Sequence, residues 1–293
     1  MIKIVISIDK EVNTKPRFIS LCSDTTFKYL YKNIKTRSWL NNIIKELFGL
    51  DLEGYQLIDN EFNTGNKTKD YRLDLILEKD NNIVIIEMNN NYYKFLTNKD
   101  YQYLYRVAGT RFEQGEDYSD KPSRLILFNN YVNKEKPKEQ KSNYKLNDPK
   151  TGLIIPDIES YEIYLPNFKR VWYDTSEVEV SLSLFSCKSY EEMREKTNNP
   201  EDIKIIEELE RLSMNEKFIY DYDREAVRIK TENSIRKEAM ELGELRGERR
   251  GMRLGEQKKE RNIVKAMLKK NMKINLISEL TGLSAKEINK LAH

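Results

Sequence analysis

Two short apolar runs separated by a polar turn dominate residues 71–89. The runs are Leu73–Leu77 and Ile83–Met88, and the segment between them contains Asp80-Asn81-Asn82. Asp and Asn are frequent in tight turns because they tolerate the left-handed backbone region or hydrogen-bond to their own backbone. The pattern therefore predicts a β-hairpin that closes near residues 80–81.

Two carboxylates lie inside this predicted hairpin. Asp74 and Glu87 are thirteen positions apart and nearly equidistant from the turn, so their side chains can meet across the strand pair. Two such carboxylates repel each other unless a cation lies between them, and hard divalent ions prefer oxygen ligands of this kind. The alternative is an ordinary hairpin with two surface acids, and the pattern alone leaves it open.

Before the hairpin, the apolar spacing predicts two helices and a strand. Ser23–Thr26 is a run of good N-cap residues. The positions expected on the buried face of the first helix are Phe27, Leu30, Tyr31 and Ile34. Those of the second helix are Trp39, Leu40, Ile43, Ile44, Leu47 and Phe48. Gly49 is expected to end this second helix, and Tyr55–Phe62 is expected to form a strand.

After the hairpin, helical spacing returns over 95–112 and is expected to stop by Gly115. Arg124–Phe128 has the composition of a short buried strand. The predicted order is therefore helix, three strands, helix, strand. Lys134–Asp148 is expected to be a charged and mobile loop, and Ser160–Leu165 can add another strand.

From Tyr190 onward the chain is highly charged and helical in pattern. The apolar face of a first helix there is Ile203, Ile206, Leu209 and Leu212, and Phe218–Met240 can supply a second helix. Glycine then recurs every four residues, at Gly243, Gly247, Gly251 and Gly255. Because each glycine costs a helix about 1 kcal/mol relative to Ala, the repeat indicates either a smooth stripe where two backbones approach closely or a flexible hinge.

The last segment predicts two short helices around Gly282. They fall within Ile277–Ile288. Helix-turn-helix DNA-binding units have this pattern, and so does any small helical hairpin, so both interpretations stay open.

Composition narrows the chemistry. The chain has 293 residues, of which 34% are charged and 39% hydrophobic, and its apolar runs are far shorter than the roughly 20 residues that span a bilayer. Met1–Ile8 is too short for a signal peptide. Cys22 and Cys187 form no motif, so we expect reduced thiols and a cytoplasmic protein.

A single histidine, His293, restricts the possible enzymes further. Catalytic triads that use imidazole and the usual zinc sites are excluded. Any catalysis must use carboxylates, Lys and Tyr, with or without a hard metal ion. The net charge of +3 is too small to indicate nucleic-acid binding by itself.

The order of elements and the positions of the acids resemble the PD-(D/E)xK nuclease fold. More closely, they resemble the bacterial recombination-promoting nuclease and transposase family within that fold. The matching pieces are Asp24–Lys28 (DTTFK), Arg72–Asp74 (RLD), Ile86–Asn89 (IEMN), Lys99 with Tyr103, Gly115–Tyr118 (GEDY) and Leu125–Phe128. The glycine repeat and the small C-terminal helical unit are also typical of that family. The resemblance covers most of the chain and is best over residues 20–130.

The resemblance implies an α/β fold with a restriction-endonuclease-like core, in which a mixed central sheet in the order αβββαβ is flanked by helices, followed by an all-α C-terminal extension. It also implies a DNA endonuclease in which Asp74 and Glu87 bind Mg²⁺, with Mn²⁺ as the alternative ion. The metal would activate a water and neutralise charge on the scissile phosphate. The resemblance places Asp24 near the metal as a third acid, although a role as an N-cap is equally open.

The chain departs from the family pattern at Asn89. The fold usually has lysine there and this family commonly has glutamine, so Asn89 can hold a water but brings no charge, and this leaves catalysis open. Lys99, where the family tends to have arginine, can supply the charge. Lys99 and Tyr103 share a helix face and can both contact a phosphate, or they can be a solvated lysine and a core tyrosine. Arg72 is on the face of Asp74 and can hold that carboxylate or contact DNA.

Basic residues cluster along the glycine repeat. The arginines among them are Arg246, Arg249, Arg250, Arg253 and Arg261. They alternate with glutamates, so a salt-bridged exposed helix is the default expectation, and a surface that tracks DNA phosphates is the sharper alternative.

The sequence thus predicts a nuclease-like domain over 1–185, a charged helical extension over 186–242 and a glycine-repeat helix with a small helical unit over 243–293. The leading hypothesis is a Mg²⁺-dependent DNA endonuclease linked to recombination or mobile elements, with DNA and a second copy of the chain, as a dimer, among its partners and no membrane. The alternatives are a catalytically impaired DNA-binding module of the same fold and an oligomerising protein built on the glycine stripe.

Overall fold

The computed structural model describes most of the chain and gives only the backbone at a few of these positions. The described residues are 16–58, 61–62, 71–93, 95–109, 122–168 and 175–292. The positions given as backbone only are 61–62, 71–72, 154–157 and 292.

The central hairpin forms as predicted. β4 (Leu75–Lys79) pairs in antiparallel register with β5 (Asn82–Asn89), so that Leu75 lies opposite Ile86. The turn between them contains Asp80 at φ 48°, a left-handed conformation that Asp and Asn tolerate better than most residues. The two strands therefore carry the register on which the position of the acids depends.

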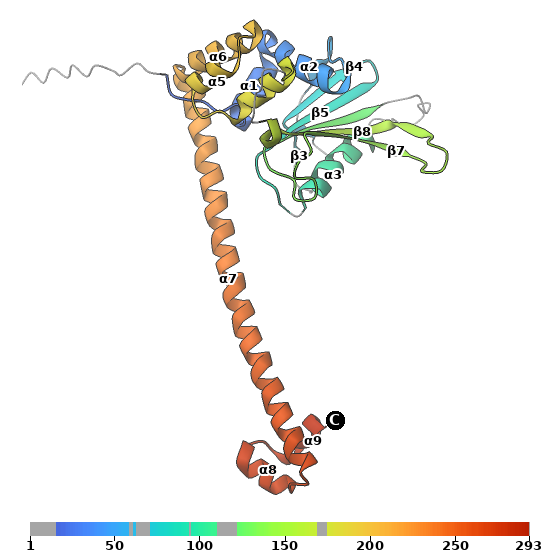
Figure 1. Ribbon diagram of the computed structural model, residues 1–293, viewed down its shortest axis with the longest axis vertical. Helices are drawn as coiled ribbons and strands as arrows, with labels where there is room; N and C mark the ends of the chain where they lie inside the picture. Colours follow the sequence, from blue (N-terminus) through green and yellow to red (C-terminus); the bar gives the residue numbers. More distant parts are fainter. Residues whose placement is uncertain are drawn as a thin grey trace, which may run out of the picture. The chain divides into compact units, whose positions relative to one another are not determined.

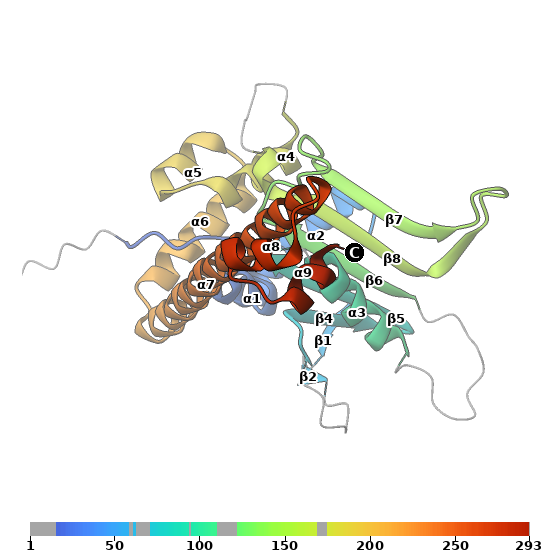
Figure 2. The ribbon, with the colours of Figure 1, turned by 90° about the horizontal axis from the view of Figure 1, so that it is seen from below.

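The hairpin belongs to a mixed sheet of six strands in the order β1-β4-β5-β6-β8-β7. β5, β6 (Ser123–Asn129) and β8 (Ile154–Tyr164) run parallel. Figure 2 shows β7 and β8 at one edge of this sheet. The prediction of an α/β protein is therefore confirmed, and the order of elements includes strands that the sequence pattern did not predict.

The expected strand Tyr55–Phe62 is split between two sheets. β1 (Gln56–Ile58) pairs with β4, whereas β2 (Glu61–Phe62) pairs with β3 (Tyr71–Arg72) in a separate two-stranded ladder. The residues expected to form one strand therefore pair with two different strands.

The prediction that Lys134–Asp148 is a loop is wrong. Residues Lys141–Asn147 form β7, which pairs with β8 in antiparallel register. β7 is an edge strand whose side chains are almost all exposed, so polar residues are compatible with it. The hydrogen bonds of the backbone, rather than an apolar face, hold the strand in place.

Most helices of the first unit cover one face of the sheet (Figure 1). They are α1 (Asp24–Lys32), α2 (Ile34–Phe48), α4 (Glu177–Ser183), α5 (Tyr190–Lys196) and α6 (Pro200–Ser213), with the short 3₁₀ turns η1 (Leu165–Phe168) and η2 (Leu184–Ser186). Gly49 ends α2 at φ 69°, as predicted. Ile34 is 81% exposed because α1 ends at Lys32 and Ile34 starts the next helix, so its predicted place on the buried face is wrong.

α3 (Leu96–Gly109) lies on the opposite face of the sheet (Figure 1). It packs Leu104 and Val107 against Ile85 and Leu125. The last residues of the predicted helix, 110–112, and the motif Gly115–Tyr118 lie outside the described residues.

The chain divides into two compact units, 1–225 and 226–293, and the division falls inside α7 (Glu216–Lys269). α4, α5 and α6 therefore share the core of the sheet, whereas the sequence placed a domain boundary near residue 185. α7 continues without a break through the four repeated glycines, and a flexible hinge there stays a prediction.

The second unit ends in the two short helices that the sequence predicted. α8 (Ile274–Thr281) and α9 (Ala285–Ala292) are joined through Gly282 at φ 75°. Val264, Ile277 and Ile288 form their small core. Over the part of the chain that the structure describes, no helix combines the length and the apolar character required to cross a bilayer.

Candidate functional site

The strand register places Asp74 and Glu87 opposite each other. Leu75 pairs with Ile86, and Asp74 and Glu87 are the next residues outward. The backbone N–H of Asp74 donates to Glu87 Oε1 at 2.8 Å, and the backbone N–H of Met88 donates to Asp74 Oδ2 at 3.0 Å. The two residues are only 8% and 4% exposed. The structure therefore brings together, in a buried position, the two acids that the sequence singled out.

This arrangement strongly disfavours the charge on Glu87. Burial and the neighbouring Asp74 carboxylate raise the pKa of Glu87 to about 8, although Lys99 lowers it. A buried carboxylate of this kind takes up a proton or pairs with a cation. The site is thus chemically suited to hold positive charge between its two acids.

Lys28 supplies a cation to this site from α1. Its Nζ lies 2.7 Å from Asp74 Oδ1. The sequence pattern indicated no role for Lys28, although Lys28 lies four residues after Asp24 and therefore on the same helix face. This spacing was the feature of the sequence that could have identified Lys28 as a site residue.

Asp24 is the first residue of α1, and Ser23 is the N-cap, with its Oγ accepting from the backbone N–H of Thr26. Asp24 Oδ1 instead accepts a hydrogen bond from Asn90 Nδ2 at 3.1 Å. The carboxylate of Asp24 thus holds the segment that follows β5, and a direct part in metal binding stays a prediction.

The start of α1 is also bound by Glu225. Its carboxylate accepts hydrogen bonds from the backbone N–H groups of Asp24 and Thr25 at 2.9 and 2.8 Å. An anion is favourable at a helix N-terminus because the free N–H groups and the helix dipole both point toward it. The beginning of α7 thereby fixes the helix that carries Lys28.

Asn89 is held in a buried polar cluster beside the acids. Its Nδ2 donates to Asp100 Oδ2 at 3.0 Å and to Asn129 Oδ1 at 3.1 Å. Both of its amide protons are therefore used, so only Oδ1 of Asn89 is left to interact with a water. Burial raises the pKa of Asp100 to about 6, while Lys99 and the bond from Asn89 lower it.

Lys99 and Tyr103 lie together on α3, as their spacing predicted. Lys99 Nζ is 5.1 Å from the centroid of the Tyr103 ring and 3.8 Å from Asp100 Oδ1. Burial lowers the pKa of Lys99, but Glu87 and Asp100 outweigh this effect, so the pKa is raised. Lys99 is consequently a stable cation near Glu87.

The remaining predicted residues either lack a described side chain or belong to the second unit. Arg72 belongs to β3, where only the backbone is described. Arg246, Arg249, Arg250 and Arg253 are exposed on α7 in the second unit.

The donor set fits a metal that takes few protein ligands. Within the described residues, no three His, Cys, Asp or Glu side chains are grouped so that they could hold an ion. Mg²⁺ commonly keeps several waters and binds through one or two carboxylates together with substrate phosphates. Asp74 and Glu87 match that pattern, whereas a fully protein-coordinated ion would need more ligands.

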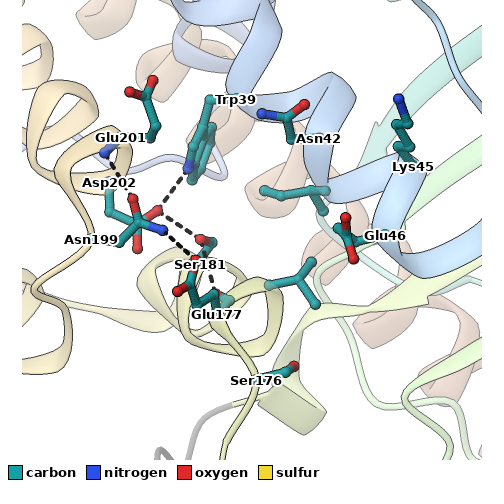
Figure 3. Close-up of a pocket in the computed structure, with 12 residues that line it drawn as sticks. Trp39, Asn42, Lys45, Glu46, Ser176, Glu177, Ser181, Asn199, Glu201 and Asp202 are labelled. Atoms are coloured by element: carbon teal, nitrogen blue, oxygen red, sulfur yellow. Dashed lines mark hydrogen bonds between the residues drawn. The ribbon is translucent and has the colours of Figure 1, made fainter.

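A cavity elsewhere in the first unit has a different character (Figure 3). It has a volume of about 680 Å³ and lies between α2, α4 and α6. At its base, the buried Asp202 accepts hydrogen bonds from Trp39 Nε1 at 2.7 Å, Ser181 Oγ at 2.6 Å and Thr197 Oγ1 at 2.7 Å. Because three donors already satisfy this carboxylate, its role is to join the helices.

Comparisons with known proteins add no further assignment. No protein-family model, curated protein or solved structure matches the chain. The candidate site therefore rests on its own residues: Asp74 and Glu87 across the hairpin, with Lys28, Asn89, Asp100, Lys99 and Tyr103 around them.

Proposed function

We propose that this protein is a Mg²⁺-dependent DNA endonuclease, with Mn²⁺ as the alternative ion. The observation that carries the proposal is the reciprocal pair Asp74 and Glu87, two buried carboxylates held opposite each other by backbone hydrogen bonds. Burying two like charges is costly unless a cation compensates for them. At neutral pH the ionised pair costs the fold stability unless a cation is bound, so a function in cation binding explains it best.

The arrangement of the surrounding elements supports the same proposal. A helix that carries Asp24 and Lys28, a hairpin that carries the two acids, a helix that carries Lys99 and a parallel strand follow one another in the order expected of a restriction-endonuclease-like core. We therefore propose that fold for the first unit, within the PD-(D/E)xK group that the sequence resembles.

Each residue has a proposed role that follows from its chemistry. Asp74 and Glu87 would hold the metal, which when bound would activate a water and neutralise phosphate charge. Lys28 and Lys99 flank the acids and would bind the non-bridging oxygens of the scissile phosphate. Together they would replace the charge that Asn89 lacks. Asn89 Oδ1 would accept a hydrogen bond from the attacking water and so orient it, and Tyr103 would support Lys99 at the phosphate.

The second unit is proposed to contribute affinity for DNA. Residues 226–293 carry 17 Lys and Arg against 9 Asp and Glu, an excess of positive charge that attracts phosphates and makes binding depend steeply on salt. Arg246, Arg249, Arg250 and Arg253 are exposed within this unit. A role in recombination or in mobile-element biology, and assembly into a dimer, belong to the same proposal.

One observation favours a second candidate, a DNA-binding module without catalysis. Lys28 already neutralises Asp74 at 2.7 Å, and a lysine that stays there would occupy the position of a metal ion. The first candidate requires Lys28 to move toward the phosphate when the metal binds. Its side chain is 27% exposed, which leaves room for that movement.

Plasmid nicking in Mg²⁺ tests the proposal. We expect Glu87→Gln, which keeps the shape of the side chain, to lose at least about 100-fold of the cleavage rate, and Glu78→Gln on the same hairpin to keep it. Equal nicking by the parent and Glu87→Gln would reject the assignment. If neither protein cleaves, but both bind DNA equally well and calorimetry detects no Mg²⁺, the non-catalytic module is the correct function.

A further inference from the structure

Three aromatic side chains are exposed on the segment that leaves β5 next to the acid pair. Tyr92, Tyr93 and Phe95 are 44%, 39% and 60% exposed; we call them the aromatic rim. They lie between the end of β5 at Asn89 and the start of α3 at Leu96. Large rings exposed together are unfavourable in water, so such a group commonly marks a binding surface.

Hydrogen bonds anchor Asn90 and Tyr93, two described residues of the segment that carries the aromatic rim. Asn90 Nδ2 donates to the carbonyl of Cys22 at 2.7 Å and to Asp24 Oδ1 at 3.1 Å, and Asn90 Oδ1 accepts from Asn130 Nδ2 at 3.1 Å. The backbone N–H of Leu96 donates to the carbonyl of Tyr93 at 2.9 Å. Exposed rings on a fixed backbone lose little conformational freedom when a flat ligand stacks on them.

The aromatic rim borders the proposed active site. The backbone N–H of Lys99 donates to the carbonyl of Phe95 at 3.0 Å, so the rim is joined directly to the residue that lies near Glu87. The ring of Tyr92 lies 5.4 Å from that of Tyr131. Tyr92 is thus packed against a second ring, from the residues that follow β6.

The local charge and depth of the site select the ligand. Between Glu87 and Asp100 the sequence contains Lys94 and Lys99 but no Asp or Glu. The segment itself therefore contributes no carboxylate that would repel a phosphate backbone. The acids themselves are nearly buried, so a single strand reaches them more readily than a rigid duplex.

We propose that the aromatic rim stacks the unpaired bases of a single-stranded DNA segment and so directs that strand to the acid pair. The inference rests on the proposed nuclease function and adds its substrate class. Stacking between bases and aromatic rings tolerates any sequence because every base has a flat face. The preferred substrates would therefore be single strands, or duplexes with a frayed or flapped end.

Fluorescence anisotropy with the full chain in EDTA, which prevents turnover, tests this substrate class. The probes are labelled dT12, an abasic oligonucleotide of the same length and charge, and a 12-base-pair duplex. The parent is expected to bind dT12 at least tenfold more tightly than either of the others. The double variant Tyr93→Leu/Phe95→Leu is expected to lose at least tenfold in affinity for dT12, about 1.4 kcal/mol, and to bind the abasic probe unchanged.

Two further variants separate stacking from folding. Tyr93→Trp/Phe95→Trp retains flat rings and is expected to restore the binding of dT12, which a role in packing alone would not predict. Tyr220→Leu removes a ring that is 68% exposed on α7 and is expected to have no effect. Equal affinity of the parent for dT12 and the abasic probe, or unchanged dT12 binding by the leucine double variant, would overturn the proposal.

The outcome of the dT12 binding experiment can be separated from the outcome of the nicking experiment. If Glu87→Gln still nicks DNA but the rings determine single-strand binding, the assigned catalytic site fails and the stacking surface stands. If nicking depends on Glu87 and the ring variants bind dT12 normally, the nuclease stands and the stacking surface fails. If no nucleic acid binds, the exposed rings belong to a contact with another protein and the proposal is rejected.

Discussion

Lys28 and Asp74 form an ion pair, with Nζ 2.7 Å from Oδ1, that joins the first helix to the central hairpin. The pair brings a cation from a different element directly to one of the two acids. Under the proposed nuclease function, it would supply the positive charge that lysine provides two residues after the glutamate in the PD-(D/E)xK pattern. Asn89 is therefore compatible with catalysis if Lys28 provides this positive charge.

Replacing Lys28 tests whether it provides the charge that Asn89 lacks. Lys28→Met keeps the aliphatic stem but removes the charge, and we expect a loss of DNA cleavage of roughly 10- to 100-fold. Lys32→Met, an exposed lysine one turn further along α1, is the matched control and should cleave like the parent. A Lys28→Met variant with higher activity would instead show that the lysine competes with the metal.

The raised pKa of Glu87 predicts an unusual dependence of stability on pH. The pKa is about 8 in the folded chain, against an ordinary value of 4.5, so folding favours the protonated form. The corresponding stability is complete below pH 4.5 and is lost as the pH rises through 8, with a slope of at most about 1.4 kcal/mol per pH unit.

Urea unfolding in EDTA between pH 5 and pH 8 measures this effect. We expect the free energy of unfolding of the parent to fall across the range and that of Glu87→Gln to fall less, because an amide does not ionise. Asp100, with a pKa of about 6, acts in the same direction and remains in the variant. Parallel curves for the parent and Glu87→Gln would contradict the prediction.

The buried carboxylate of Asp202 predicts a large effect on stability without an effect on chemistry. Asp202→Ala leaves Trp39 Nε1, Ser181 Oγ and Thr197 Oγ1 without their acceptor, and we expect a loss of roughly 3 kcal/mol in chemical denaturation.

The neighbouring Glu201 provides the control for Asp202. Its salt bridge to Lys204 is exposed, so Glu201→Ala should cost less than about 1 kcal/mol. If folded Asp202→Ala lost DNA cleavage at a temperature well below its melting point, the cavity beside Asp202 would have a functional role after all.

Two glycines of the second unit, one in the repeat of α7 and one after α8, are predicted to respond to alanine in opposite ways. A Cβ added at Gly247 or at Gly282 meets nothing within 4 Å. Gly247 has helical backbone, so Gly247→Ala should stabilise the second unit by up to about 1 kcal/mol. Gly282 has φ 75°, so Gly282→Ala should destabilise it by about 1 kcal/mol.

Thermal melts followed by circular dichroism, with light scattering on the same samples, measure both changes. A close approach of two helices along the glycine stripe would reverse the first expectation, because the added methyl would obstruct it. In that case Gly247→Ala would lower both the melting temperature and the oligomeric state, and the stripe would be the contact surface.

The sequence by itself determined the hairpin and several helix ends. Turn residues, runs of β-branched residues and a glycine at a helix end are local signals. The strands on either side of Asp80 and the end of α2 at Gly49 were therefore predictable from nearby residues in the sequence. The turn sets the register of the two strands. Together with the alternation of side chains along each strand, this register determined that Asp74 and Glu87 could face each other.

Only the tertiary structure decided what surrounds those acids. Lys28 reaches Asp74 from a helix 46 residues earlier in the chain, and Asp100 and Asn129 bind the Asn89 amide from two other elements. β7 likewise forms on the edge of β8 although its own sequence is polar. Such contacts depend on which distant segments meet in the fold, and neither local propensity nor hydrophobic periodicity encodes that meeting.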